Sequence, residues 1–194
     1  MGSDMTTRIN SVAWRAVQPG QQMIEGEQHD IVIVECGDLM LPSGRLVAED
    51  PFVTLTTDNL YYLVPPGTYP VRATVDETIG RVMYLSLCLS PAPEVVRRVL
   101  IPHRPDGSAY PTPVYDSYYG IAVDAGTVCF VDDEAVKRGM PTDESSWLSE
   151  VFDNDSEKCW FKMTDAADHP TAGIANIPLP LTSDGANIVI CHSG

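Results

Sequence analysis

Short apolar runs separated by turn-forming residues at nearly regular intervals are the feature that most constrains the fold of this 194-residue chain. In its middle part, runs of roughly five to nine residues rich in Val, Ile, Leu, Tyr and Thr alternate with turns built from Pro, Gly, Asn and Asp. Turns at intervals of about 8–12 residues are typical of antiparallel sandwiches and barrels. The sequence therefore predicts a mainly β fold, an antiparallel β-sandwich or flattened barrel with two short helices.

The predicted strands occupy residues 31–36, 52–56, 60–64, 69–75, 81–89, 95–101, 118–123, 127–131, 158–163 and 186–191. Asp124-Ala125-Gly126 is predicted to be a hairpin turn, and Gly67, which follows two prolines, is predicted at the positive-φ position of a type II turn. The residues expected in the core are Ile33, Val47, Val53, Leu63, Val71, Val82, Tyr84, Leu87, Val123, Phe130, Trp160 and Ile190.

Both expected helices lie in the second half of the chain. Asp132 or Asp133 is suited to N-cap a helix over 134–138, and Gly139 is suited to end it. Thr142 is the expected cap of a second helix over 143–152. Its predicted buried face, through which the helices would pack on one edge of the sandwich, consists of Trp147, Leu148 and Val151.

Length and composition indicate one β-rich domain over residues 31–194, preceded by a tag remnant and lead-in segment over 1–30. No apolar stretch is long enough to cross a bilayer, and the N-terminus lacks the pattern of a signal peptide. The five cysteines form no CxxC pair and are expected to be buried free thiols, with a catalytic thiol at Cys129 or Cys191 as the alternative. Together these features predict a cytoplasmic protein.

Acidic residues dominate the charge: 27 Asp and Glu oppose 12 Lys and Arg, for a net charge of −15. This balance argues against binding to nucleic acid or to anionic membranes, which both reward basic side chains. The excess is concentrated in residues 132–168, which form either a solvated acidic face or a surface for a basic protein partner. The candidate partner-binding residues are Asp132, Asp133, Glu144, Asp153, Asp155 and Glu157.

Catalytic chemistry has weaker support, because no GxSxG, Walker A or GxGxxG motif is present. Asp50 and Asp124 each lie where an apolar run meets a turn, so two carboxylates could meet for acid–base work together with His192. The alternative is that both are turn formers that bond the local backbone.

A calcium loop is suggested only by the start of residues 153–164. Lys158 stands where an EF-hand needs Gly and Thr164 where it needs Glu, so the match fails. Asp153, Asp155 and Glu157 remain weak candidates for a metal site, and no cofactor is predicted.

Three motifs follow one another in a fixed order: PSGRLVAEDP at 42–51, VPPGTYPV at 64–71 and GIAVDAGTVCFVD at 120–132. Together they resemble an uncharacterised bacterial family, domain of unknown function 4241, from about Cys36 to the C-terminus. In that family the stretch that matches 188–194 continues into a Gly-Asp-Gly-rich segment and further strands. Here it stops at Gly194, which suggests a truncated or processed chain or a natural departure.

Two functions follow as hypotheses. The first is an acidic interaction protein of immunity type, which neutralises a bacterial toxin by covering its site. The second is a small hydrolase that uses Asp50 and Asp124 with His192 or a divalent metal. The two differ in whether Asp50, Asp124, Asp132 and His192 converge in one pocket or scatter over turns.

Overall fold

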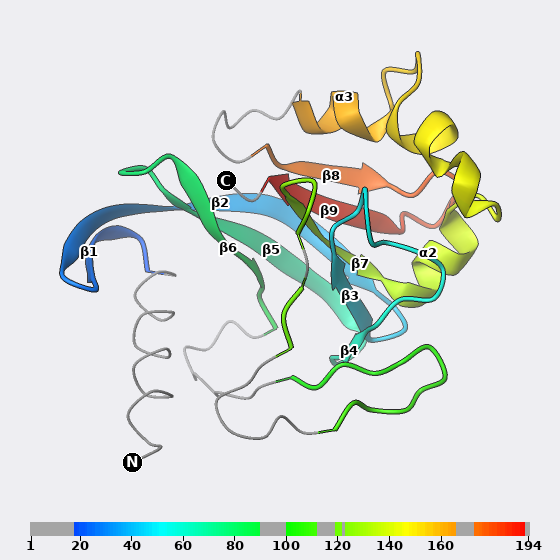
Figure 1. The fold of residues 1–194 in the computed structure, drawn as a ribbon, viewed down its shortest axis with the longest axis horizontal. Helices are drawn as coiled ribbons and strands as arrows, with labels where there is room; N and C mark the ends of the chain where they lie inside the picture. Colours follow the sequence, from blue (N-terminus) through cyan, green and yellow to red (C-terminus); the bar gives the residue numbers. More distant parts are fainter. Residues whose placement is uncertain (1–17, 90–99, 112–118, 122, 166–172, 193–194) are drawn as a thin grey trace.

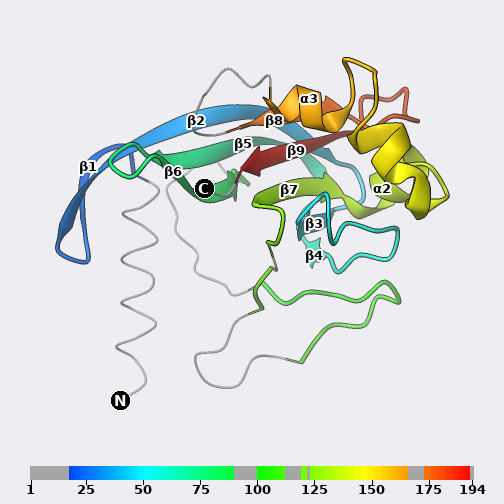
Figure 2. The ribbon, with the colours of Figure 1, turned by 45° about the horizontal axis from the view of Figure 1, so that its top comes forward.

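Two antiparallel sheets and a helical layer make up the part of the chain that the computed structural model describes, residues 18–89, 100–111, 119–121, 123–165 and 173–192 (Figures 1 and 2). The first sheet has the order β1-β2-β5-β6, with β1 Gly20–Ile24, β2 Glu27–Leu41, β5 Gly67–Asp76 and β6 Arg81–Leu87. The second has the order β4-β3-β7-β9-β8, with β3 Arg45–Glu49, β4 Tyr62–Leu63, β7 Thr127–Asp132, β8 Ala175–Pro178 and β9 Asn187–His192. The sheets form a sandwich over the described residues and do not close into a barrel, which confirms the predicted mainly β fold.

The helical segments cover the outer face of the second sheet. They are α2 Asp133–Gly139, the 3₁₀ turn η1 Glu144–Ser146, the π-helical turn η2 Leu148–Phe152 and α3 Trp160–Asp165. Strand β9 lies between this helical layer and the first sheet, and all its residues except His192 are buried. Ile188 and Ile190 pack toward the helices, and Val189 and Cys191 pack toward the first sheet. A strand covered on both faces reads as a continuous apolar run and not as an alternating one.

Helix α2 begins and ends where the sequence predicts. The Asp132 side chain caps it by accepting a hydrogen bond from the Ala135 amide. Gly139 is the last residue of the helix and packs so tightly that a Cβ would lie 2.9 Å from the Leu179 side chain. The second predicted helix is a 3₁₀ turn and a π-helical turn, and Asp143, not Thr142, caps the first of these.

The buried face of these turns also differs from the expectation. Trp147 and Val151 are buried, whereas Leu148 is 60% exposed and Phe152 takes its place in the core. These side chains pack on the face of the second sheet and not on an edge of the sandwich. The π-helical hydrogen bonding changes the angular spacing of the side chains, which explains why a regular helical period misplaced Leu148.

Three predicted strands are wrong over the described residues. Residues 158–163 mainly belong to helix α3, in which buried Trp160 and Thr164 are spaced by four residues and the Thr164 hydroxyl donates to the Trp160 carbonyl. Residues 52–56 begin as a turn because the amides of Val53, Thr54 and Leu55 all donate to the Asp50 carbonyl. Residues 119–121 and 123 form no strand, so Asp124-Ala125-Gly126 is not a hairpin turn. The strand predicted over 95–101 lies almost entirely outside the described residues.

Other strands appear where the sequence predicted none. Strand β1 lies within the segment 1–30 that was interpreted as a lead-in, and it pairs with β2 in a long hairpin (Figure 1). Strand β8 lies after α3, between the strands predicted over 158–163 and 186–191, and it forms an edge of the second sheet, where Pro178 is tolerated.

The predicted core is correct at Val47, Val71, Trp160 and Ile190, which are all buried. Five others, Ile33, Val82, Tyr84, Leu87 and Phe130, are partly buried and pack against the core clusters. Val53, Leu63 and Val123 are exposed, so these three were wrong.

The predicted conformation of Gly67 is wrong as well, because Gly67 begins strand β5 and does not have a positive φ. The glycine of that region with a positive φ is Gly44, at +69°, and a Cβ on it would lie 2.5 Å from the Val64 carbonyl oxygen. Gly44 therefore allows the turn between β2 and β3 to lie in close contact with Val64, the residue that follows β4, where a side chain would not fit.

None of the helices among the described residues is long and apolar enough to span a bilayer.

Candidate functional site

Asp50 lies at the junction of two turns and is completely buried. Its Oδ2 accepts hydrogen bonds from the amides of Asp124 and Ala125 at 2.9 and 2.7 Å. Its Oδ1 accepts from the Phe52 amide at 3.1 Å and from the Thr127 hydroxyl at 2.9 Å. Four donors therefore occupy this carboxylate, which ties the turn after β3 to the turn before β7.

The other two catalytic candidates do not complete an acid–base set with Asp50. Asp124 approaches it through its backbone amide, and the Asp124 side chain is exposed. His192 is the backbone partner of Thr127 at the end of β9, so it lies at the same end of the sheet. Its ring packs against Gly173, where a Cβ would come within 2.5 Å of it. The His192 carbonyl, and not the ring, accepts a hydrogen bond from the Cys191 thiol.

Glu49 is a half-buried carboxyl group that is not among the candidates from the sequence. Burial raises its pKa, the Thr54 hydroxyl that donates to it opposes the rise, and the adjacent Asp50 charge adds to it. The hydrogen bond and the neighbouring charge both depend on the turn that follows β3, and the sequence gives no signal of that turn beyond Asp50-Pro51.

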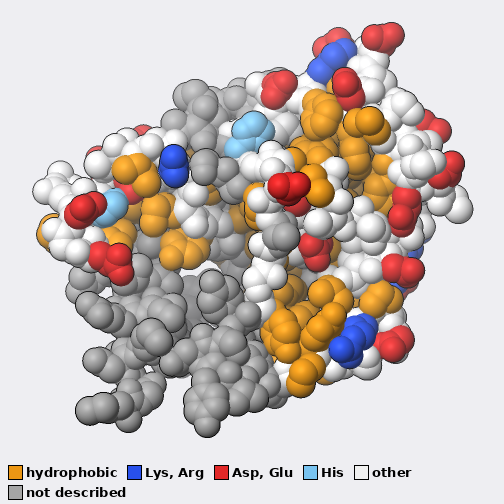
Figure 3. Space-filling model, viewed as in Figure 1, with side chains coloured by type: hydrophobic (Ala, Val, Ile, Leu, Met, Phe, Trp, Pro, Cys, Tyr) orange, Lys and Arg blue, Asp and Glu red, His pale blue; other side chains and the backbone are white. Residues whose placement is uncertain are grey.

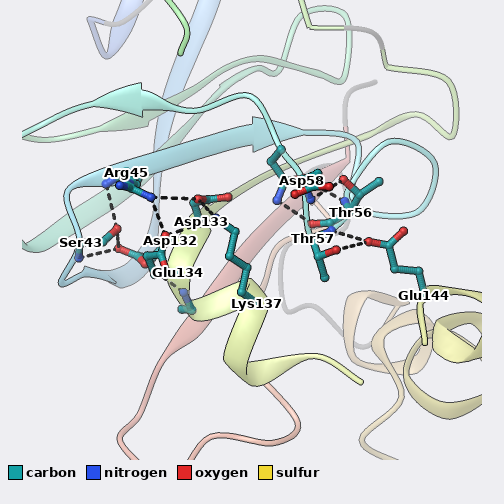
Figure 4. A network of polar contacts seen from close by, with 12 residues as sticks. Ser43, Arg45, Thr56, Thr57, Asp58, Asp132, Asp133, Glu134, Lys137 and Glu144 are labelled. Carbon is teal, nitrogen blue, oxygen red and sulfur yellow. Dashed lines mark hydrogen bonds and ion pairs between the residues drawn. The ribbon is translucent and has the colours of Figure 1, made fainter. Parts of the chain in front are cut away.

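Asp132 and Asp133 lie at the opposite end of β7, roughly 17 Å from Thr127 at the strand rise of about 3.4 Å per residue. Both carboxylates are buried (Figure 4). Asp132 caps α2 and accepts hydrogen bonds from the Ser43 amide and hydroxyl at 2.9 and 2.8 Å. Asp133 pairs with Lys137 at 2.7 Å, and Arg45 lies 3.8 Å away. These two acids stabilise the fold and are not available to a partner.

The four residues whose convergence would indicate a catalytic pocket do not all meet. Asp50, Asp124 and His192 lie at one end of β7 and Asp132 lies at the other, and Asp50 and Asp132 each have their own set of donors. This distribution favours the structural reading of the turn-borne carboxylates over a shared catalytic pocket.

The remaining candidates, Glu144, Asp153, Asp155 and Glu157, are all exposed. Glu144 accepts hydrogen bonds from the Thr57 amide and hydroxyl, both at 2.6 Å (Figure 4). Asp153, Asp155 and Glu157 lie in the connection between η2 and α3. Over the described residues, no group of three or more His, Cys, Asp and Glu side chains is arranged to hold a metal ion.

Exposed acids continue along the whole of residues 143–165, which we call the acidic segment. They are Asp143, Glu144, Glu150, Asp153, Asp155, Glu157 and Asp165. Among the described residues, the ion pair between Lys162 and Glu157, at 3.5 Å, is the only one that involves an acid of this segment. Most of its negative charge is therefore free to face solvent.

A groove of about 510 Å³ lies beside this acidic segment, between η2, α3 and strand β8. Val151, Trp160 and Met163 line it from the helical side, and Ile177 and Leu179 line it from the strand side. Its volume is in the range of ligand and anchor pockets, about 300–1,000 Å³. This groove was not predicted from the sequence, because a strand over 158–163 would point Trp160 and Met163 to opposite faces, whereas helix α3 brings both to the groove.

Three of the buried cysteines, Cys36, Cys129 and Cys191, are unsuited to nucleophilic chemistry. Burial raises the pKa of Cys36 to about 11 and that of Cys191 to about 12, and burial also raises that of Cys129. A thiol with such a pKa is almost fully protonated near neutral pH, and the thiolate is the reactive form. All five cysteines are free, as predicted, and four of them are buried, whereas Cys88 is only half-buried.

Comparison with known proteins gives one match. The model of a protein family described as "Protein of unknown function (DUF4241)" matches residues 39–194. No curated protein and no solved structure matches the chain.

Proposed function

The chain belongs to the DUF4241 family, and we propose that it is a protein-interaction module of immunity type, which binds a basic toxin through its acidic segment. This proposal rests on the difference between the buried acids and the exposed acids. Asp50, Asp132 and Asp133 are buried and bonded within the fold, whereas the acids of residues 143–165 are exposed and mostly unpaired.

Unpaired charge on a rigid surface has a kinetic effect. A concentrated negative field accelerates encounters with a positively charged partner by about 10–1,000-fold at low ionic strength. The acidic segment is built on helical turns whose apolar side chains, among them Trp147 and Phe152, are fixed in the core. The field therefore has a defined orientation relative to the sandwich.

A hydrolase remains the competing function. It has less support, because the Asp50 carboxylate already accepts four hydrogen bonds and the Asp124 side chain does not approach it. The raised pKa of Glu49 is the feature that favours acid–base chemistry.

The test is a pull-down from the source cell with the product of the neighbouring gene as bait. The proposal expects a basic protein in a complex that high salt weakens, and expects this protein to lose its toxicity when the two are co-expressed. If no partner is recovered and Asp50→Asn or Asp124→Asn abolishes a measurable turnover, the hydrolase is the correct reading.

A further inference from the structure

The groove between η2, α3 and β8 has apolar residues on both of its walls, and each wall segment also carries an exposed leucine. Leu148 belongs to η2 and is 60% exposed, and Leu181 follows β8 and is 63% exposed. Among the described large hydrophobic residues these two are the most exposed. Both belong to segments that line the groove, although neither is itself a lining residue.

Acidic residues lie in and beside the lining of this groove, which also contains one basic residue, Lys158. Glu150 lines the groove, and Asp153, Asp155 and Glu157 alternate along the connection whose residues Asn154, Ser156 and Lys158 also line it. One of the two lysines of this region, Lys162, is occupied by the Asp155 carbonyl and by Glu157. In Figure 3 the apolar side chains at the upper right lie among acidic ones.

The wall formed by η2 is itself unusual. Its π-helical hydrogen bonding extends over Leu148–Phe152. Such turns are rare and are found frequently at functional sites. Here the π-helical turn places Val151 in the groove and leaves Leu148 in solvent.

We propose that this groove anchors one bulky apolar side chain of the partner, carried on a segment with Lys or Arg on either side of it. The inference rests on the proposed function and specifies the contact through which the chain would bind its partner. Protein interfaces combine a desolvated apolar anchor with a polar rim, and the groove and its acids have this arrangement. The charge of the rim selects a basic segment over an acidic one.

Short peptides test the proposal without knowledge of the partner. The probes are KKWKK and KKSKK, which differ in the anchor, EEWEE, which reverses the flanks, and free indole. Each is titrated into the full chain at low ionic strength, and binding is followed by the amide NMR signals. We expect KKWKK to bind at least about tenfold more tightly than KKSKK, because one large apolar side chain becomes buried. The largest shifts are expected at Val151 and Met163.

Two proline variants localise the binding. Pro180 is an exposed residue of the groove lining, and Pro180→Trp fills the groove from its border. Pro105 is an exposed turn proline outside the lining, so Pro105→Trp is the matched control. We expect Pro180→Trp to remove the preference for KKWKK over KKSKK and Pro105→Trp to preserve it.

The outcomes separate the two proposals. Equal binding of KKWKK and KKSKK, with salt-dependent binding retained, overturns the anchor and leaves the acidic interaction surface standing. Basic peptides that bind no better than EEWEE overturn both. If indole and EEWEE bind as tightly as KKWKK, the groove is a site for a small apolar molecule and the anchor proposal is wrong.

Discussion

Replacement of Asp50 provides the sharpest test of how the acids are divided between fold and function. Asp50→Ala removes the acceptor of three backbone amides and of the Thr127 hydroxyl. A buried donor left without a partner costs about 1–3 kcal/mol. Asp124 and Ala125 are exposed, so water can hydrogen-bond to their amides in place of the carboxylate. We therefore expect the free energy of unfolding to fall by roughly 3–6 kcal/mol in total.

Asp50→Asn is expected to cost less. The Asn side chain keeps one oxygen, which still accepts from the Phe52 amide and the Thr127 hydroxyl. Its NH₂ group, however, faces the Asp124 and Ala125 amides, which now donate to Oδ2. The free energy of unfolding is measured by urea denaturation, with Asp58→Ala as the control, because Asp58 is an exposed acid of the same region. The control is expected to change stability by less than about 0.5 kcal/mol. An Asp50→Ala variant as stable as the wild type would refute the structural role.

Three further predictions follow from the backbone, the buried ion pair and the thiols. Gly44→Ala is expected to lower stability by at least about 1 kcal/mol, because its φ is +69° and a backbone oxygen occupies the space of the new Cβ; thermal unfolding measures this. Burial acts to raise the pKa of Asp76, but hydrogen bonds from His29 and Thr78 outweigh it and the pKa is lowered. The stability that Asp76 contributes is therefore present above about pH 4 and is lost as the pH falls through the lowered pKa. Urea denaturation should show that the free energies of unfolding of the wild type and of His29→Ala become equal in acid. Cys36 and Cys191 are expected to resist iodoacetamide at pH 8 in the native protein and to react in urea; rapid native labelling of either would contradict the raised pKa values.

The sequence predicts the sandwich well because turn chemistry and apolar runs are local signals. Where it fails, a non-local contact decides the structure. Residues 52–56 have the composition of a strand, but their amides converge on the Asp50 carbonyl and make a turn. Residues 158–163 became a helix because Trp160 and Thr164 both find space against the second sheet, which depends on β8, an edge strand that the sequence did not reveal.

The candidate site shows the same division. The cap of α2 follows a local rule and was predicted to be Asp132 or Asp133, of which Asp132 is correct, and the free thiols follow from spacing. The burial of Asp50 and Asp133 was not predictable, because part of their surroundings comes from distant segments: the Asp124 and Ala125 amides donate to Asp50, and Arg45 of β3 lies 3.8 Å from Asp133. The groove was invisible for the same reason, since its two walls meet only in the folded chain.

The association rate of the chain with the product of the neighbouring gene, measured by stopped flow at several salt concentrations, tests the central claim most directly. The triple variant Asp153→Lys, Asp155→Lys, Glu157→Lys reverses charge in the acidic segment. The control variant reverses the exposed acids Glu25, Glu27 and Glu77 at the β1–β2 end of the molecule (Figure 1). We predict that the first variant associates at least about tenfold more slowly at low salt, that the difference shrinks at high salt, and that the control changes the rate far less. Equal slowing by both variants, or a rate independent of salt, would contradict a partner surface in the acidic segment.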